Sequence, residues 1–161
     1  MRKQGFLDKL HREGKIRIVE PSVQVQEAYR KKSESYLASA KILFENGRLE
    51  ETVSMAYYSM YYMVLALLFA TGIKCENHSG AIILLENLYG IDNTRIAAAK
   101  RERIDKQYYV DFAITVEDVR NSIEEAEAFY ADLLDYMERL HQGDISRLRE
   151  EAARLLEGSP V

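Results

Sequence analysis

The chain has few of the residues on which disulfide-linked and β-rich proteins depend. Its 161 residues include one cysteine, Cys75, two prolines and no tryptophan. A single cysteine excludes an intramolecular disulfide, and no signal-peptide or targeting pattern is visible, so we expect a reducing, cytoplasmic location. Strong helix formers dominate over β-branched runs, which argues against a sheet and predicts an all-α protein.

Catalytic and metal-binding patterns are also missing. The sequence has no glycine-rich phosphate loop, nucleophile elbow, paired-carboxylate arrangement or dinucleotide fingerprint. The one close pair of metal-ligand residue types is Cys75 and His78, whereas a tetrahedral zinc site needs four ligands. We therefore expect no metal and no cofactor. The net charge of −4 argues against a general nucleic-acid coat but leaves room for a local basic patch.

One uncharged run of 22 residues, from Thr52 to Ile73, is long enough to suggest a membrane span. Its first half holds four tyrosines, whereas a membrane span places tyrosines at its ends. Apolar residues also occupy nearly every face of the helix that this run would form, which is typical of a helix buried in protein. We expect the central helix of a bundle and no membrane contact. The four tyrosines are Tyr57, Tyr58, Tyr61 and Tyr62.

Residues 1–161 predict a single domain, an up-and-down antiparallel helical bundle of four to five main helices with short terminal helices. The core is expected at about residues 22–141, after an N-terminal arm of residues 1–21 and before a C-terminal helix at 144–157. Asn46-Gly47 and Gly72 predict the ends of two long helices. Further helices are expected from Ser79 to Tyr89, after Asp92 or Asn93, after Thr115 to about His141, and after a break at Gly143-Asp144.

Two sets of side chains are candidates for binding. Tyr57 and Tyr58 have rings that could stack on bases, although packing in a core or dimer interface is the other interpretation. His78 could bridge to their hydroxyls, cap the following helix, or act as a catalyst because its ordinary pKa lies near neutral. Its position beside serine and glycine favours the local hydrogen-bonding role.

The densest polar cluster follows in the fourth helix: Arg101, Arg103, Asp105, Tyr108 and Tyr109. Arginine binds phosphate with two parallel hydrogen bonds, which makes this cluster the first candidate for a ligand site. A solvated helix face is the alternative interpretation of such a run.

Several segments together resemble the HEPN superfamily (higher eukaryotes and prokaryotes nucleotide-binding), in particular its small stand-alone prokaryotic branch. The resemblance covers about residues 9–140 and includes a basic N-terminal arm. It implies a helical bundle that often dimerises, is frequently encoded beside a minimal nucleotidyltransferase, and in active members is a metal-independent RNase of toxin–antitoxin or defence systems. The matching segments are AYYSMYY from Ala56, HSG from His78, and RIDKQYY from Arg103 followed by ITVED.

The chain departs from the pattern of the active members, in which histidine follows an arginine after four to six residues. Here Arg103 is followed after four residues by Tyr108. Tyrosine, with an ordinary pKa near 10, is a poor base at neutral pH. Binding of a nucleotide, RNA or a nucleotidyltransferase partner is therefore the first expectation. A divergent RNase toxin using Arg103 with Tyr108 or His78, and a non-catalytic dimer or adaptor, stay open as alternatives.

Overall fold

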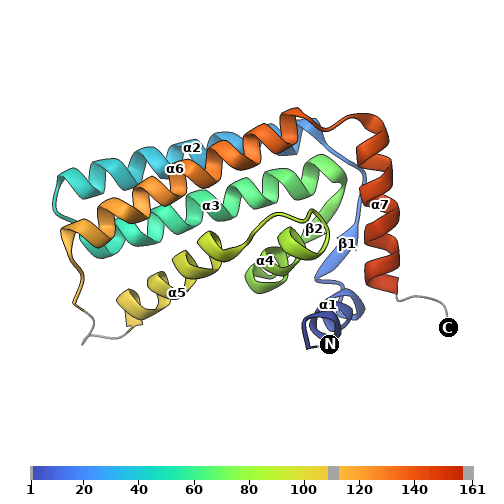
Figure 1. Cartoon of the computed structure of the whole chain (residues 1–161), viewed down its shortest axis with the longest axis horizontal. Coiled ribbons are helices and arrows are strands. Elements are labelled where there is room, and N and C mark those ends of the chain that lie inside the picture. The colour runs from blue at the N-terminus through green and yellow to red at the C-terminus, as the bar shows by residue number, and fades with distance from the viewer. Residues whose placement is uncertain (1, 109–112, 158–161) are drawn as a thin grey trace.

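The computed structural model describes residues 2–108 and 113–157, and the side chains of 3–104 and 113–157. This part of the chain forms seven helices and one two-stranded sheet (Figure 1). The predicted all-α bundle is confirmed. The helices are α1 (Arg2–Arg12), α2 (Val23–Glu45), α3 (Leu49–Thr71), α4 (His78–Asn87), α5 (Thr94–Tyr108), α6 (Val116–Glu138) and α7 (Gln142–Glu157), and the strands are β1 (Ile16–Ile18) and β2 (Ile73–Cys75).

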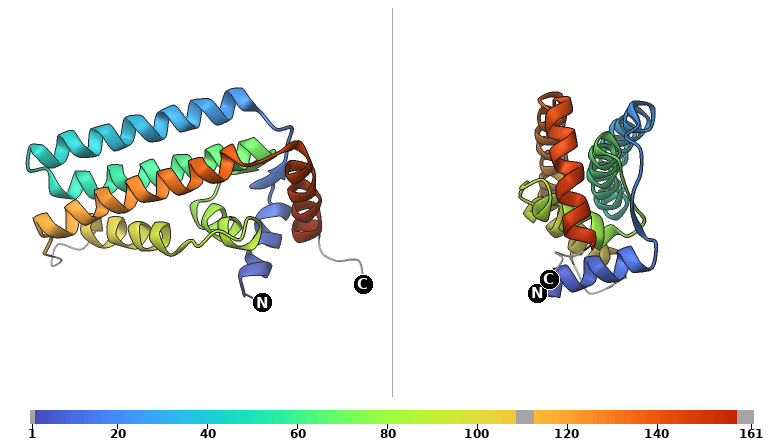
Figure 2. Two further views of the ribbon diagram at one scale, coloured as in Figure 1. Left: turned by 45° about the horizontal axis from the view of Figure 1, so that its top comes forward. Right: turned by 90° about the vertical axis from the view of Figure 1, so that its right-hand side faces the viewer.

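Helix α3 is the central rod of the bundle. It lies between α2 and α6, with α5 along a further side (Figures 1 and 2). Fifteen of its 23 residues are buried, among them Tyr57 and Met63. It is long and apolar enough to cross a membrane, but 67% of its most apolar window is buried inside the structure. Other helices of the same chain thus cover most of α3, as expected for the central helix of a bundle.

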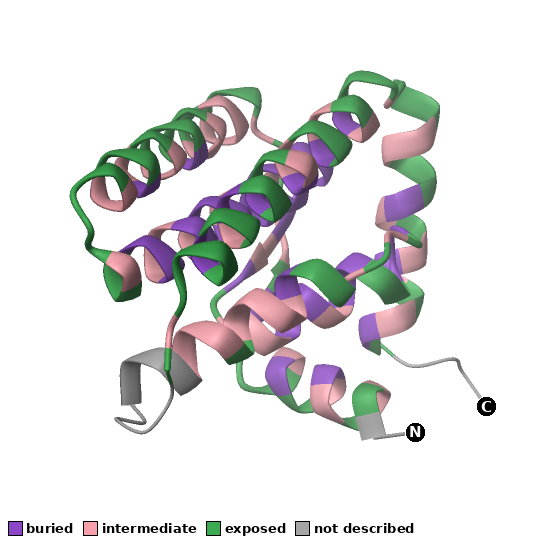
Figure 3. Ribbon diagram, turned by 60° about the vertical axis from the view of Figure 1, so that its left-hand side comes forward, coloured by how far each residue is buried: buried purple, intermediate pink, exposed green. Residues whose placement is uncertain are grey.

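Burial follows the faces that point toward α3. Helix α2 buries only Ser33 and Ala40 and leaves most of its outer surface exposed, whereas α6 buries six residues at helical spacing, from Val119 to Met137 (Figure 3). At the α2–α3 contact, Ser33 Oγ donates to the carbonyl of Ser59 (2.7 Å), and Ser59 Oγ donates to the carbonyl of Ser33 (2.9 Å). These small residues let the two backbones approach closely.

The expectation that no sheet would form is wrong in one detail. Strands β1 and β2 pair antiparallel, with Ile16 opposite Cys75 and Ile18 opposite Ile73. Gly72, with a φ of 79°, ends α3 in the left-handed region and lets the chain enter β2 directly. Both Ile16 and Ile73 are fully buried, so the sheet ties the predicted N-terminal arm to the bundle. Three-residue strands are too short to give a clear alternating pattern.

Two predicted helix starts are shifted. The side chain that caps α4 is Asn77, whose Oδ1 accepts from the Gly80 amide at 2.8 Å, so Ser79 lies inside the first turn. Helix α7 begins before the expected break, and Asp144 caps it by accepting from the His141 amide at 3.0 Å. Thr115 caps α6 as predicted, through a bond from the Asp118 amide.

Helix α7 packs on the body of the same chain. Leu148, Ala152 and Leu156 are buried. Arg149 Nη1 donates to the carbonyls of Val19 (2.7 Å), Thr71 (3.1 Å) and Gly72 (3.3 Å). One side chain thus joins α7 to the end of α3 and to the segment that follows β1.

Candidate functional site

Helix α5 turns one face toward the first turn of α4. Ile96, Lys100 and Arg103 follow one another at steps of four and three, which places them on the same side of a helix. Ile96 is fully buried and anchors this face to the bundle, while Lys100 and Arg103 are half-buried further along. The local sequence therefore directs two cationic side chains toward the interior edge of the fold.

His78 lies beside the residues that these two cations contact, namely Ser79 and the tyrosines of α3. It is the first residue of α4 and is half-buried against α3. Its ring stacks on Tyr61, with centroids 3.8 Å apart and planes 9° apart. Its Nδ1 lies 2.7 Å from the hydroxyl oxygen of Tyr57. The predicted bridge from His78 to a hydroxyl of the tyrosine helix is thus present.

The geometry around Tyr57 fixes the tautomer of this imidazole. Tyr57 is fully buried, and within the described part of the chain His78 Nδ1 is the one hydrogen-bond partner of its hydroxyl. Burial raises the pKa of Tyr57 well above its usual range, so the hydroxyl keeps its proton. A buried O–H that accepted instead of donating would leave its hydrogen without a partner, which is costly. We therefore assign the donor to Tyr57, which places the ring proton of neutral His78 on Nε2.

Arg103 lies over the tyrosine pair of α3. Its guanidinium carbon is 5.3 Å from the ring centroids of both Tyr57 and Tyr58. Its Nη1 also donates to the Tyr58 hydroxyl at 3.2 Å. Cation–π contacts of this kind hold a guanidinium in place without neutralising its charge. Arg103 is thus held over Tyr57 and Tyr58, the two tyrosines that contact His78.

Lys100 completes the cluster from the preceding turn of α5. Its Nζ donates to Ser79 Oγ at 2.5 Å, and it forms no ion pair with a carboxylate in the described part of the chain. The backbone amides of His78 and Ser79 belong to the first turn of α4, where N–H groups have no partner within the helix. The positive end of the α4 dipole thus adds to the two cations.

These groups disfavour further positive charge. The pKa of His78 is lowered by its burial and by the charges of Arg103 and Lys100. The pKa of Lys100 is likewise lowered by burial and by Arg103. Like charges held close repel one another, and an anion between them would relieve that repulsion. We call Tyr57, His78, Ser79, Lys100 and Arg103 the cationic site. Its chemistry suits a phosphate group: a guanidinium, an ammonium, an imidazole N–H and a helix N-terminus.

The predicted residues divide between this site and other places. Tyr57, Tyr58, His78 and Arg103 are brought together, whereas Arg101 is exposed and lies about 200° around α5 from Arg103. The backbones of Asp105 and Tyr108 belong to α5, but their side chains lie outside the described residues. Tyr109 lies outside them altogether.

Sequence reasoning did not include Lys100 and Ser79 among the site residues. The spacing of Lys100 and Arg103 on the face anchored by Ile96 would have indicated Lys100. Nothing in the sequence indicated Ser79, because its contact with Lys100 joins two helices 21 residues apart.

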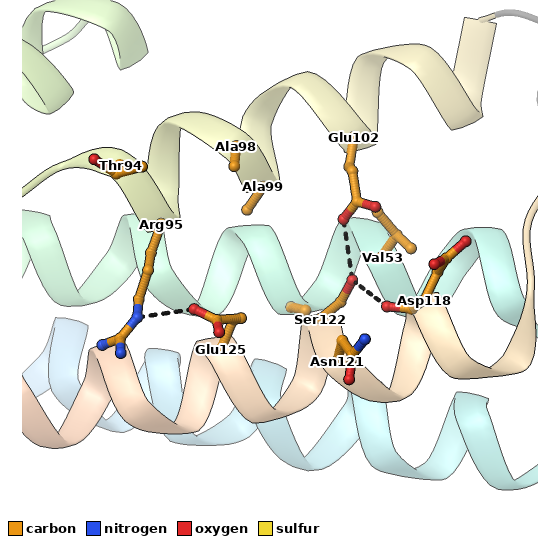
Figure 4. Close-up of a pocket in the computed structure, with 11 residues that line it drawn as sticks. Val53, Thr94, Arg95, Ala98, Ala99, Glu102, Asp118, Asn121, Ser122 and Glu125 are labelled. Atoms are coloured by element: carbon orange, nitrogen blue, oxygen red, sulfur yellow. Dashed lines mark hydrogen bonds and ion pairs between the residues drawn. The ribbon is translucent and has the colours of Figure 1, made fainter.

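A neighbouring face of α5, about 100° around the helix, lines a different kind of pocket, with a volume of about 310 Å³, between α3, α5 and α6. Figure 4 shows Glu102 accepting a hydrogen bond from Ser122 (3.2 Å) and Arg95 paired with Glu125 (2.8 Å). The floor is apolar, with Val53 and Ala99, and the rim carries three carboxylates to one arginine. These charges would repel a phosphate, so this pocket and the cationic site have opposite preferences.

The fold is that of an all-α helical bundle built around the tyrosine-rich helix α3. A family model described as the HEPN domain matches residues 26–140, well over half of the chain. The chain therefore belongs to the HEPN domain family. This agrees with the resemblance of the AYYSMYY, HSG and RIDKQYY segments.

Three proteins of other organisms are similar to parts of this chain. A UPF0332 protein of Thermotoga maritima is 29% identical over 73% of this chain and 91% of its own length. A UPF0332 protein of Pyrococcus horikoshii is 46% identical, but over only 35% of this chain and 39% of its own length. A protein of Methanocaldococcus jannaschii named "Putative toxin MJ0605" is 32% identical over 60% of this chain and 77% of its own length.

Proposed function

We propose that this HEPN domain binds RNA through its phosphate backbone at the cationic site, as a module of a toxin–antitoxin type system. The observation on which the proposal depends is that Lys100 contacts Ser79 at the N-terminus of α4, while Arg103 lies over Tyr57 and Tyr58, whose rings contact His78. Lys100 contacts the residue next to His78, and Arg103 lies over two tyrosines whose rings contact the imidazole, so the three groups surround one small region. The toxin system enters from the name of the Methanocaldococcus relative.

Within this site His78 acts as a hydrogen-bond donor. Tyr57 occupies Nδ1, and Nε2 carries the proton, so the neutral ring offers an N–H to a phosphate oxygen. Arg103 supplies a guanidinium, and Lys100 supplies an ammonium as a point charge. None of these contacts reads a base, so the proposal predicts affinity with little sequence preference.

The direct test is a titration of a labelled single-stranded RNA, followed by fluorescence anisotropy in buffer containing EDTA. Affinity should fall with rising salt, and Lys100→Gln should make the slope of log K against log salt less steep by about 0.7, the value of one phosphate contact on a single strand. Lys41→Gln is the matched control, because Lys41 is paired with Glu127 on another surface. Equal slopes for both variants and the unmodified chain would refute the proposal.

Cleavage of the bound RNA is the second candidate function. It is favoured by a neutral imidazole beside two cations, and by the toxin name of a relative. A base must accept the proton of the attacking 2′-hydroxyl, and both nitrogens of His78 are occupied in the assigned tautomer. The geometry therefore supports binding better than cleavage. If the RNA is shortened in the same EDTA buffer, and Arg103→Ala abolishes this cleavage, the protein is an RNase instead.

We extend the proposal to partners. The family resemblance implies a homodimer and a minimal nucleotidyltransferase encoded next to the gene. Light scattering that gives only the mass of one chain at micromolar concentration would contradict the dimer. A neighbouring reading frame without a nucleotidyltransferase would remove the support for that partner.

A further inference from the structure

A row of half-buried aromatic rings follows the contact between α2 and α3. Tyr36 lies between Tyr58 and Tyr62, with ring centroids 6.0 Å and 5.0 Å away. Tyr29 stacks on Tyr62 (5.9 Å, 14° between planes). We call Tyr29, Tyr36, Tyr58 and Tyr62 the tyrosine stripe. Tyr29 and Tyr36 lie two turns apart on α2, and Tyr58 and Tyr62 one turn apart on α3, so antiparallel packing brings the two pairs together.

The stripe differs from the core tyrosines of the same bundle. Tyr57, Tyr61 and Tyr89 are at most 7% exposed, whereas all four members of the stripe keep part of their surface accessible. The backbone beneath them is held by the reciprocal bonds between Ser33 and Ser59. The stripe is thus a set of rings on a closely packed base, left open on one side.

Positive charge borders the stripe at two positions. The Lys32 ammonium lies 4.5 Å from the centroid of Tyr62, and the Arg103 guanidinium 5.3 Å from that of Tyr58. At the Tyr58 end the stripe meets the cationic site, because the ring of Tyr58 also contacts that of His78, edge on, at 6.4 Å. Rings and cations therefore form one continuous surface that ends at the proposed phosphate position.

We propose that the tyrosine stripe is a base-stacking surface that receives the single-stranded RNA leading to the cationic site. Open aromatic rings alternating with cations are the chemistry by which proteins hold single strands without reading their sequence. The inference rests on the proposed function, because RNA held at the cationic site brings its neighbouring bases to Tyr58. If the tyrosine stripe served only as a contact between two copies of the chain, it would not require Lys32 and Arg103 above its rings.

The experiment compares a labelled single-stranded RNA with an abasic oligonucleotide of equal length and phosphate number. The unmodified chain should bind the RNA more tightly, by about 5- to 150-fold for each stacked base. Tyr36→Leu should remove most of this difference, and Tyr36→Phe, which keeps the ring, should retain it. Arg103→Ala should weaken both ligands together. Circular dichroism confirms that each variant is folded.

The outcomes separate the two proposals. Equal binding of RNA and abasic strand, unchanged in Tyr36→Leu, would overturn the stripe and leave the cationic site standing. If neither the RNA nor the abasic strand binds, both the tyrosine stripe and the cationic site are overturned as binding surfaces. A Tyr36→Leu variant that lowers the mass measured by light scattering but binds RNA as before would assign the stripe to a contact between two copies and would also overturn the inference. If Tyr36→Leu fails to fold, Tyr29→Leu replaces it, because it removes another ring of the stripe, and it should weaken binding of the RNA more than binding of the abasic strand.

Discussion

Replacing Tyr57 by phenylalanine removes the hydroxyl that bonds to Nδ1 of the His78 imidazole. The hydroxyl is fully buried with its ring, and its bond to Nδ1 measures 2.7 Å. A buried hydrogen bond of this kind contributes about 0.5–1.5 kcal/mol net. For a chain of this size each kcal/mol corresponds to about 2–4 °C in Tm. Tyr57→Phe should therefore lower Tm by a few degrees and leave the fold intact.

The same substitution should change the chemistry of His78. With the donor gone, the neutral ring loses the bond that selects the Nε2–H tautomer, and its pKa should rise toward the ordinary value. Long-range proton–nitrogen NMR correlations report both quantities, and the chain has only three histidines to assign. Tyr89→Phe is the control, because its hydroxyl lies 2.6 Å from Thr71 Oγ1, away from the imidazole. A proton on Nδ1 of His78 in the unmodified chain would refute the reasoning.

Three further outcomes follow from the contacts. Burial, Arg103 and Lys100 lower the pKa of His78 in the folded chain, so the unfolded chain binds a proton more readily. The free energy of unfolding should therefore fall as the pH drops below about 6.5, the ordinary pKa of histidine. Denaturant titrations of His78→Gln should lack this part of the pH dependence. RNA binding should strengthen over the same pH range, since charged His78 favours an anion, and anisotropy at pH 7.5 and 5.5 checks this. Gly72→Ala should cost about 2–5 kcal/mol of unfolding free energy, because its φ is 79° and its Cβ would meet Arg149 Nη1 at 1.8 Å. The control Gly47→Ala, also at positive φ but in open space, should cost about 1–2 kcal/mol.

The bundle could be predicted from the sequence because its evidence is local. Asn46-Gly47 and Gly72 end two helices, Thr115 begins another, and the uncharged run around Tyr57 indicates the buried rod. Sheet β1–β2 could not be predicted, since its strands have three residues each and are joined by pairing across the chain. The cap of α4 was misplaced because Asn77 and Ser79 are both good capping residues, and only backbone geometry selects between them.

The candidate site was predictable only in part. The sequence indicates Arg103 and His78 as separate candidate residues, and it indicates the hydroxyl of Tyr57 as a partner of His78. That Lys100 reaches Ser79 depends on the angle between α4 and α5, which no local pattern determines. Arg101 was placed in the same candidate ligand site as Arg103, although two helical steps separate the side chains by about 200°.

The central claim is that the face of α5 with Lys100 and Arg103, and not its exposed surface, holds the RNA phosphate. The most direct measurement is the RNA affinity of Arg103→Ala beside that of Arg101→Ala, two variants that lose the same charge from the same helix. The account predicts a loss of tenfold or more for Arg103→Ala, as a charge-assisted hydrogen bond of about 1.5–3 kcal/mol implies, and little change for Arg101→Ala. Equal losses in the two variants would mean that RNA responds only to net charge, and would contradict the account.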